Sequence, residues 1–279
     1  MKSKRLVFLG VTFFLLVAAR AAHPNIPPKK GVKWPAAFAE RVKADRTAFT
    51  YTRSYVQTVQ RITRNRIAMQ RGEITMAAAS AAGGSVVSGT KSIPVLTAKF
   101  NNTTANPYSV ANLQKELFDG PWPTGTMTEY YREISYGHFT VNGTVFDWKK
   151  LSKDDTHYEG GCNGICNAAK TGEFLKGTLQ LHDPSVNFAQ YDNDGPDGTP
   201  NSGDDDGFVD FVAFVHPESG GECGNTNIWS HRWALTGWGA GDFTTSDAKS
   251  GGGFIKVNDY VIMPAFACDG TTMIQIGVF

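Results

Sequence analysis

The stretch from Tyr191 to Val215 constrains the fold of this chain more than any other. It holds seven aspartates in a loop rich in Gly, Pro and Asn, and it ends in the apolar run Phe211 to Val215. The pattern predicts a cation-binding loop that leads into a buried strand, because glycines permit the sharp turns by which several oxygen ligands converge on one hard ion. The aspartates are Asp192, Asp194, Asp197, Asp204, Asp205, Asp206 and Asp210.

Calcium suits such a loop, because it takes several oxygen ligands in flexible geometry. An EF-hand loop beginning at Asp192 would need Gly at position 197 and Glu at position 203, where this chain has Asp and Gly, so any site is of another type. Alternate residues of an extended loop face the same side, and Asp197 and Asp205 are therefore the weaker candidates. A solvated acidic turn without an ion is the alternative. The expected calcium ligands are Asp192, Asp194, Asp204, Asp206 and Asp210.

The first residues predict an export signal. Basic residues precede the apolar run Leu6 to Val17, and small residues suitable for a signal peptidase follow near Ala21. The apolar run is short of the roughly 20 residues that span a bilayer. We therefore expect residues 1–22 to be a signal peptide, the protein to be secreted and extracellular, and no membrane anchor to be present.

Four cysteines fit an exported chain: Cys162, Cys166, Cys223 and Cys268. An even number suggests two disulfides, for which three connectivities are possible. We prefer Cys162 with Cys166 and Cys223 with Cys268, because CNGIC forms a local loop that contains glycine. A zinc knuckle is the alternative, although the spacing matches no common structural zinc pattern.

The net charge of +1 hides a division of the chain. Residues 23–75 carry eleven Lys and Arg against three Asp and Glu, a net +8, and residues 76–279 carry twelve against 23, a net −11. Apolar residues from Ala36 to Gln70 recur at helical spacing, which predicts one or two basic amphipathic helices. We expect this segment to dock on the acidic part in a salt-sensitive way rather than to bind nucleic acid or a membrane. A loosely ordered arm is the alternative.

Residues 76–91 are small and low in complexity, which predicts a flexible linker before a domain over residues 92–279. The hydrophobic content of the whole chain, 41%, is enough for this domain to bury a core. We expect a strand over 92–100, a helix over 110–117 capped by Ser109, and a second helix capped by Thr126 or Thr128. A hairpin should turn at Asn142 and Gly143. The order of elements predicts an α+β domain.

Several motifs then resemble one family. TMTEYYREISYGHFTVNGTV (126–145), the aspartate loop, IWSHRW (228–233), VIMPAF and the closing IQIGVF are similar, in the same order, to the immune inhibitor A family of secreted zinc metallopeptidases. The similarity extends from about Ile93 to Phe279. It implies a zincin-type domain with a mixed sheet and helices, preceded by a helical pro-segment, and it implies zinc, calcium, and protein or peptide substrates.

The H-E-x-x-H helix that defines such enzymes is absent from the sequence, because none of the six histidines begins one. In the family this motif follows a segment like IQIGVF. The resemblance therefore implies an N-terminal fragment that ends before its zinc helix and is inactive as given. We assign no catalytic residue and no zinc ligand, and the alternative function is a non-catalytic secreted module for calcium binding or adhesion.

Four other residues are possible ligands of lower rank. His216 and His231 could approach a substitute metal site, although a structural role is the simpler interpretation for each. Glu218 and Glu222 could be further calcium ligands or face a substrate, although a solvated loop is the simpler interpretation there.

Overall fold

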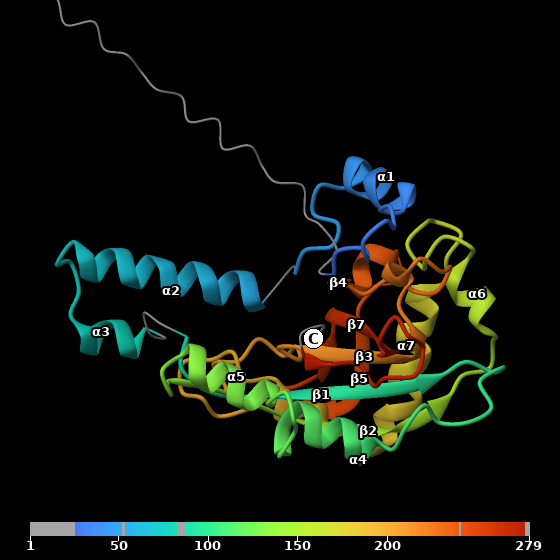
Figure 1. Ribbon diagram of the computed structural model, residues 1–279. Helices are drawn as coiled ribbons and strands as arrows, with labels where there is room; N and C mark the ends of the chain where they lie inside the picture. Colours follow the sequence, from blue (N-terminus) through green and yellow to red (C-terminus); the bar gives the residue numbers. More distant parts are fainter. Residues whose placement is uncertain (1–25, 52–53, 83–86, 240, 277–279) are drawn as a thin grey trace, which may run out of the picture.

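The computed structural model describes residues 26–51, 54–82, 87–239 and 241–276, so the expected signal peptide lies outside the described residues (Figure 1). The helices are α1 (Ala36–Ala44), α2 (Ser54–Gln70), α3 (Met76–Ala81), α4 (Val110–Gln114), the π-helix η1 (Lys115–Asp119), α5 (Met127–Ile134), α6 (Asp155–Glu159) and α7 (Thr171–His182). The short 3₁₀ helices are η2 (Asp183–Ser185), η3 (Phe188–Tyr191), η4 (Gly221–Cys223) and η5 (Leu235–Trp238). The strands are β1 (Gly89–Lys99), β2 (Phe139–Lys150), β3 (Val212–Ser219), β4 (His231–Ala234), β5 (Phe243–Ala248), β6 (Phe254–Val257) and β7 (Asp259–Phe266).

A five-stranded mixed sheet forms the centre, in the order β2-β1-β3-β7-β4. The first four strands are parallel and β4 pairs antiparallel with β7, while β5 and β6 form a separate antiparallel pair. Central parallel strands are buried on both faces and therefore read as continuous apolar runs. The run Phe211 to Val215 follows this rule, because all but its first residue lie in β3 and are buried.

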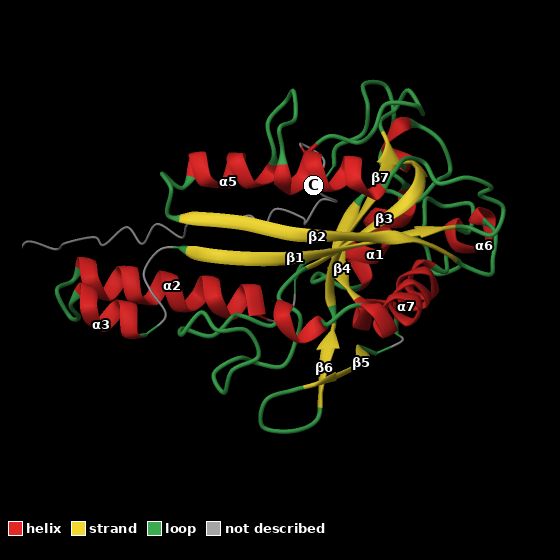
Figure 2. Cartoon of the chain, turned by 90° about the horizontal axis from the view of Figure 1, so that it is seen from below, coloured by secondary structure: helices red, strands yellow, loops and turns green. Residues whose placement is uncertain are grey.

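Helices cover both faces of the sheet, and alternate strand residues enter two separate cores (Figures 1 and 2). On one face, Phe214 packs in a core that also contains Phe174 of α7 and Phe38 of α1. On the other face, its neighbour Val215 packs in a core with residues of α4, η1 and α5. The predicted combination of a mixed sheet with helices is confirmed.

The local signals at two helices are confirmed. The Ser109 side chain accepts a hydrogen bond from the backbone N–H of Asn112 at the start of α4. Thr126 begins α5 with a complete capping box, in which its hydroxyl accepts from the Glu129 N–H and the Glu129 carboxylate accepts from the Thr126 N–H. These reciprocal bonds satisfy donors that a helix start would otherwise leave unpaired.

The predicted hairpin at Asn142 and Gly143 is wrong. Both residues lie inside the continuous strand β2, where Gly143 is paired in register with Ile93 of β1. A Cβ at Gly143 would lie 2.2 Å from the Phe118 ring and 2.4 Å from the Ile93 carbonyl oxygen. The glycine is therefore required for close packing under η1 and does not mark a turn.

Residues 26–51 join the sheet through aromatic contacts. Phe49 is fully buried, with ring centroids 5.0 Å from Trp233 and 4.8 Å from Phe38, and Trp34 stacks on Trp229 at 5.3 Å. The basic residue most involved is Arg41, whose guanidinium lies over Trp238 and donates to the carbonyl oxygens of residues 165 and 166. Apolar packing thus contributes to this contact beside the contacts of Arg41, and its salt sensitivity stays a prediction.

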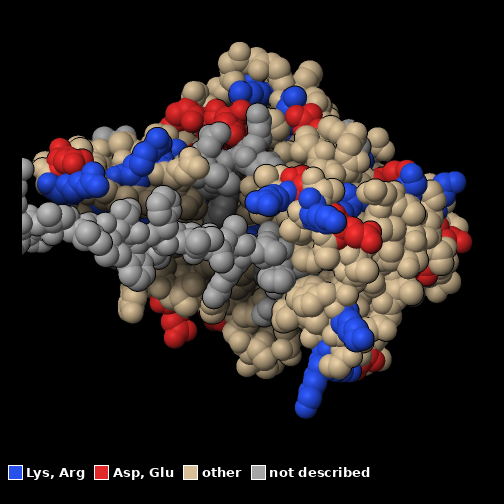
Figure 3. All heavy atoms as spheres, turned by 90° about the horizontal axis from the view of Figure 1, so that it is seen from above, with Lys and Arg blue, Asp and Glu red and all other residues tan. Residues whose placement is uncertain are grey.

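Helices α2 and α3 lie side by side in a short arm beside the sheet (Figures 1 and 2). The Asn65 side chain of α2 donates to the carbonyl oxygen of Ala82 at 3.0 Å. Figure 3 shows Lys and Arg side chains along this arm and a group of Asp and Glu near its junction with the main body. Part of the segment expected to be a linker, Met76 to Ala81, is thus helical, and β1 begins at Gly89.

The disulfides pair Cys162 with Cys166 and Cys223 with Cys268, as preferred from the sequence. The second bond links the residue that ends η4 to the segment just after β7. Among the described residues, no helix combines the length and the hydrophobicity needed to cross a bilayer.

Candidate metal centre

The aspartate loop is held between two parts of the molecule. At its base, the N–H of Asp210 donates to the carbonyl oxygen of Tyr191 at 2.8 Å, so the end of η3 is joined to the start of β3. On the other side, the N–H of Lys256 in β6 donates to Gly207 and the N–H of Val209 donates to Lys256, each at 2.9 Å. These backbone bonds fix both ends of the acidic segment.

Three carboxylates of the loop converge. Asp192, Asp194 and Asp205 each offer one oxygen, and these oxygens lie within 4.8 Å of one another. Asp192 is fully buried, and its Oδ2 accepts from the Gly207 N–H at 3.0 Å, while its Oδ1 has no hydrogen-bond partner within the part of the chain that the structure describes. The second unpaired oxygen here is the side-chain Oδ1 of Asn193. Because these two buried oxygen atoms accept no hydrogen bond, they are available to coordinate a cation.

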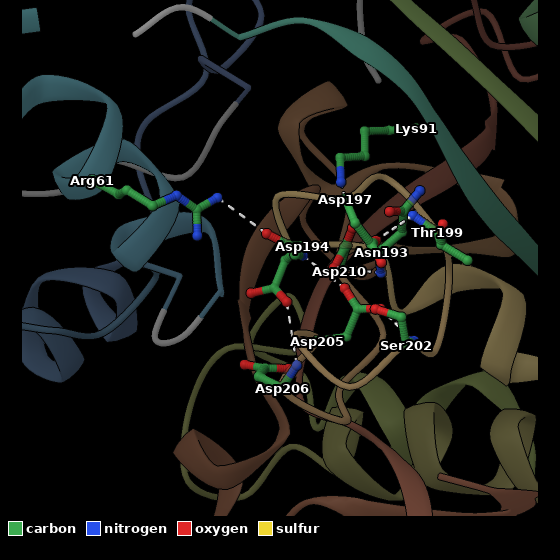
Figure 4. Close-up of polar contacts among 11 residues, drawn as sticks. Arg61, Lys91, Asn193, Asp194, Asp197, Thr199, Ser202, Asp205, Asp206 and Asp210 are labelled. Atoms are coloured by element: carbon green, nitrogen blue, oxygen red, sulfur yellow. Dashed lines mark hydrogen bonds and ion pairs between the residues drawn. The ribbon is translucent and has the colours of Figure 1, made fainter. Parts of the chain in front are cut away.

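Loop backbone groups orient the third carboxylate. Asp205 accepts from the N–H of Gly195 at 2.6 Å and from the N–H of Ser202 at 2.8 Å, one with each oxygen. The Asp194 Oδ1 accepts from the N–H of Asp206 at 3.3 Å. The chain therefore folds over its own carboxylates and brings residues ten positions apart into one cluster (Figure 4).

The crowding of charge affects proton binding. Burial, and after it the neighbouring carboxylates of Asp205, Asp206, Asp210 and Asp194, raise the pKa of Asp192 to about 7. Burial likewise raises the pKa of Asp194. A carboxylate that is buried among others holds its proton more tightly until a cation neutralises the group.

The other aspartates of the loop have different surroundings. Asp204 is exposed and its carboxylate accepts from the hydroxyl of Ser202 and the N–H of Asp197, while Asp206 accepts from the N–H of Phe208 at 2.9 Å. Asp210 lies 3.5 Å from the ammonium of Lys91. Burial raises the pKa of Asp210 to about 7, and the charge of Lys91 opposes that shift.

The structure thus brings Asp192 and Asp194 together with Asp205, which the sequence argument ranked below Asp204. Alternation along an extended loop does not apply, because the loop turns back on itself between residues 195 and 204. The sequence argument also missed two cations beside the loop, Arg61 of α2 and Lys91 of β1 (Figure 4). Arg61 donates to the carbonyl oxygen of Asp194 at 3.1 Å. No sequence signal links either cation to the loop.

The donor set fits a hard cation such as calcium. Carboxylate, amide and carbonyl oxygens are the ligands that calcium prefers, and among the described residues Asp192 Oδ1 and Asn193 Oδ1 are buried oxygens without a hydrogen-bond partner here. Softer nitrogen and sulfur donors are not part of this cluster.

The described histidines do not fit a zinc site. His231 is fully buried, and its ring nitrogens lie 2.6 Å from the Trp229 carbonyl oxygen and 2.8 Å from the Tyr260 hydroxyl. Burial lowers the pKa of His231 to about 4 and that of the equally buried His216 to about 3. Within the described ranges, no group of three possible metal ligands includes a histidine. Both histidines are core residues.

Comparison with known proteins gives relatives in bacteria. The chain is 27% identical over 200 residues to the pre-pro-metalloprotease PrtV of Vibrio cholerae serotype O1 strain M66-2, which covers 65% of this chain and 22% of that protein. It is 28% identical over 168 residues to immune inhibitor A of Bacillus thuringiensis subsp. alesti, which covers 54% of this chain and 24% of that protein. The chain thus matches less than a quarter of the length of these relatives.

One family profile also matches. It is described as the catalytic domain of immune inhibitor A peptidase M6, and it matches residues 102–277. This range contains the aspartate loop, the strands from β2 onward and both disulfides. Because the match covers more than half of the chain, the chain belongs to the immune inhibitor A family of M6 peptidases.

Proposed function

We propose that this chain is part of the precursor of a secreted, zinc-dependent endopeptidase, and that its aspartate loop binds a structural calcium ion. The observation that carries the proposal is the match of the catalytic-domain profile to residues 102–277. Metallopeptidase relatives support zinc as the catalytic metal and proteins or peptides as substrates. A zincin-type arrangement is the fold that we expect for the complete domain.

The 279 residues supply a scaffold in this proposal, and we assign no catalytic group to them. The zinc motif H-E-x-x-H is not among them, and His216 and His231 are held in the core. Zinc, when bound by such a motif, supplies a Lewis acid and an activated water for peptide hydrolysis.

An activity measurement tests the first part of the proposal. The purified 279-residue chain, supplied with zinc, should not cleave casein. Cleavage that a chelator abolishes would contradict the assignment of no catalytic group to these residues. A chain extended through an H-E-x-x-H segment of the same gene should gain chelator-sensitive cleavage, and failure of that chain would favour the alternative, a non-catalytic secreted module for calcium binding or adhesion.

Calcium binding by the loop is supported by the unpaired Oδ1 of the buried Asp192 and by the close approach of Asp194 and Asp205. An ion there would neutralise three converging carboxylates and join the start of β3 to β6 through the loop. Binding to the folded state alone stabilises that state by mass action. We therefore expect calcium to raise the melting temperature of the chain.

Two matched variants test the calcium site. Asp192→Asn and Asp204→Asn remove the same charge from the same loop, but the first residue is buried in the cluster and the second is exposed. After treatment with EGTA, added calcium should raise the melting temperature of the wild type and of Asp204→Asn. Asp192→Asn should bind calcium at least tenfold more weakly, measured by calorimetry. A wild type that does not respond, or equal losses in both variants, would contradict the site.

We further propose that residues 23–75 form a pro-segment. The support is the fully buried Phe49, because residues 26–51 complete one of the two cores of the domain. N-terminal sequencing of the protein recovered from the culture medium tests secretion and processing together. A secreted protein that begins near residue 23 and loses residues 23–75 on activation is the expected result, and retention of residues 23–75 in the active enzyme would contradict it.

A further inference from the structure

A second acidic site lies on the opposite face of the sheet from α7. A cavity of about 270 Å³ opens between the loop after β1, the helices α4 and η1, and the segment after β7. Its lining includes Tyr108, Glu116, Trp122 and Phe266. The aspartate loop contributes nothing to this cavity, so the cavity is separate from the candidate metal centre.

Glu116 is one of the residues that line this cavity. The residue is fully buried in the π-helix η1, and neither of its carboxylate oxygens has a hydrogen-bond partner among the described residues. Burial raises the pKa of Glu116 to about 7. The backbone N–H of Ile276 partly offsets this shift, but it makes no hydrogen bond of normal geometry with either oxygen. Buried carboxylates without a partner are rare, and π-helical turns are frequent at functional sites.

A second orphaned group lies beside Glu116. The Tyr108 hydroxyl is buried and has no hydrogen-bond partner in the described ranges, and burial, followed by the Glu116 charge, raises the pKa of this phenol. Its ring meets Phe266 edge to face, with centroids 5.9 Å apart, and Trp122 adds a third aromatic wall. No Lys, Arg or His is among the described residues that line the cavity, so nothing there neutralises the carboxylate.

We propose that this cavity binds one organic cation, the ammonium or guanidinium group of a lysine-like or arginine-like side chain. Aromatic walls around a single buried carboxylate suit such a group, because ring faces attract cations and the carboxylate accepts their N–H donors. A calcium ion needs more oxygen ligands than one carboxylate supplies. The volume suits one side chain rather than a larger ligand. This inference does not depend on peptidase activity.

Binding of small probes to the 279-residue chain tests the proposal. We would titrate Nα-acetyl-lysine methylamide, Nα-acetyl-arginine methylamide and the neutral Nα-acetyl-norleucine methylamide, and follow binding by calorimetry and melting temperature. Both cationic probes should bind and raise the melting temperature, and the norleucine probe should not. Absence of binding by both cations, or equal binding of the norleucine probe, would overturn the proposal.

Matched variants locate the binding. Glu116→Gln keeps the shape and removes the charge, and we expect at least a tenfold loss of affinity for the cationic probes. Glu133→Gln removes an exposed carboxylate from α5 and should bind as the wild type does. Glu116→Gln should fold at least as stably, because a buried amide needs less desolvation than a buried charge. If Glu116→Gln does not fold, Tyr108→Phe is tested instead, and we expect it to bind the cationic probes more weakly than the wild type. Unchanged affinity in the variant tested would overturn the proposal.

Two further measurements distinguish binding of an organic cation at Glu116 from binding of a neutral group or a metal ion. Affinity should rise about tenfold from pH 6 to pH 8, because the charged form of Glu116 becomes the main one and the Tyr108 phenol stays neutral. A pH-independent affinity would contradict the role of Glu116. Calcium should not displace the probes, and displacement that Glu116→Gln abolishes would replace the organic cation with a metal ion and overturn the proposal.

Discussion

Glu159 and Glu218 face each other where α6 ends near β3, and each leaves one carboxylate oxygen without another partner. Burial, and after it the charge of Glu159, raise the pKa of Glu218 to about 8. Burial also raises the pKa of Glu159. Two carboxyl groups in this position share a proton more readily than they carry two charges.

The pair predicts a loss of stability as the pH rises. Because the pKa of Glu218 is higher in the folded state than its ordinary value of 4.5, its stabilising protonation is complete below that value and is lost as the pH rises through about 8. In Glu218→Gln, the decrease in unfolding free energy between pH 5 and pH 8 should be smaller by on the order of 2 kcal/mol, after allowance for solvent screening. Urea unfolding of both proteins at pH 5 and pH 8, in the presence of EGTA, measures this difference.

The exposed Glu133 supplies the control for this measurement. Glu133→Gln should keep the pH dependence of the wild type, since it removes an exposed carboxylate from the surface of α5. If Glu218→Gln and Glu133→Gln had the same slope between pH 5 and pH 8, the shared proton would not contribute to stability.

Single residues of the candidate sites were only partly predictable. The density of aspartates indicated the loop, but the choice of Asp205 over Asp204 depends on how the loop folds back onto the N–H groups of Gly195 and Ser202. Glu116 gave no signal, because one glutamate in a short helix looks like a surface residue until its neighbours in space are known. Spatial partners distant in sequence decide both cases.

At the scale of elements, β2 depends on one glycine. A side chain at Gly143 would collide with the Phe118 ring and with the backbone of β1. Gly143→Ala should therefore lower the unfolding free energy by about 1–3 kcal/mol, the usual effect of overpacking. Asn142→Ala, at the exposed neighbouring position in the same strand, should change it by less than about 0.5 kcal/mol.

Chemical unfolding of both variants is the measurement. A hairpin turn at this point would need both residues, and Asn142→Ala would then be as destabilising as Gly143→Ala. Equal losses would therefore argue against the continuous strand.

Elements with local signals were predictable, and those set by packing were not. The Thr126 capping box and the Ser109 cap are read from adjacent residues and occur as expected. The sequence Asn-Gly is a strong turn signal on its own, but ten residues of β1 pair with β2 and hold it extended. Here the sheet and the helix above it override the local preference.

At the scale of the whole molecule, the N-terminal segment and the sheet share one core. Phe49→Ala should lower the unfolding free energy by about 3–5 kcal/mol, because it removes a fully buried ring that contacts Phe38 and Trp233. Addition of 1 M NaCl should change the stability of the wild type little, since apolar packing is not screened by salt.

An exposed cation of α2 supplies the control. Arg66→Ala removes positive charge from the same N-terminal part without touching the core, and its effect should stay within about 0.5 kcal/mol. Urea unfolding with and without salt compares the three proteins. If Phe49→Ala lowered the unfolding free energy little and salt lowered it strongly, charge would be the main cause of the attachment of the N-terminal segment to the sheet.

The contact between the N-terminal segment and the sheet was only partly predictable from the sequence. Opposite net charges predicted that the two parts meet, and they do meet. The aromatic residues that carry the contact, Trp34, Phe38 and Phe49, have no pattern that distinguishes them from the apolar face of any amphipathic helix. Their partners Trp229 and Trp233 lie almost 200 residues later, so only the folded chain reveals the pairing.

The bond between Cys223 and Cys268 encloses β4, β5, β6 and β7 in one covalent loop. A single cut by a foreign protease anywhere inside that loop would therefore produce two polypeptides that remain one molecule. On a denaturing gel the nicked protein would migrate as a single species until a reductant is added. In a medium that contains competing proteases, damage to this segment would thus leave the domain assembled.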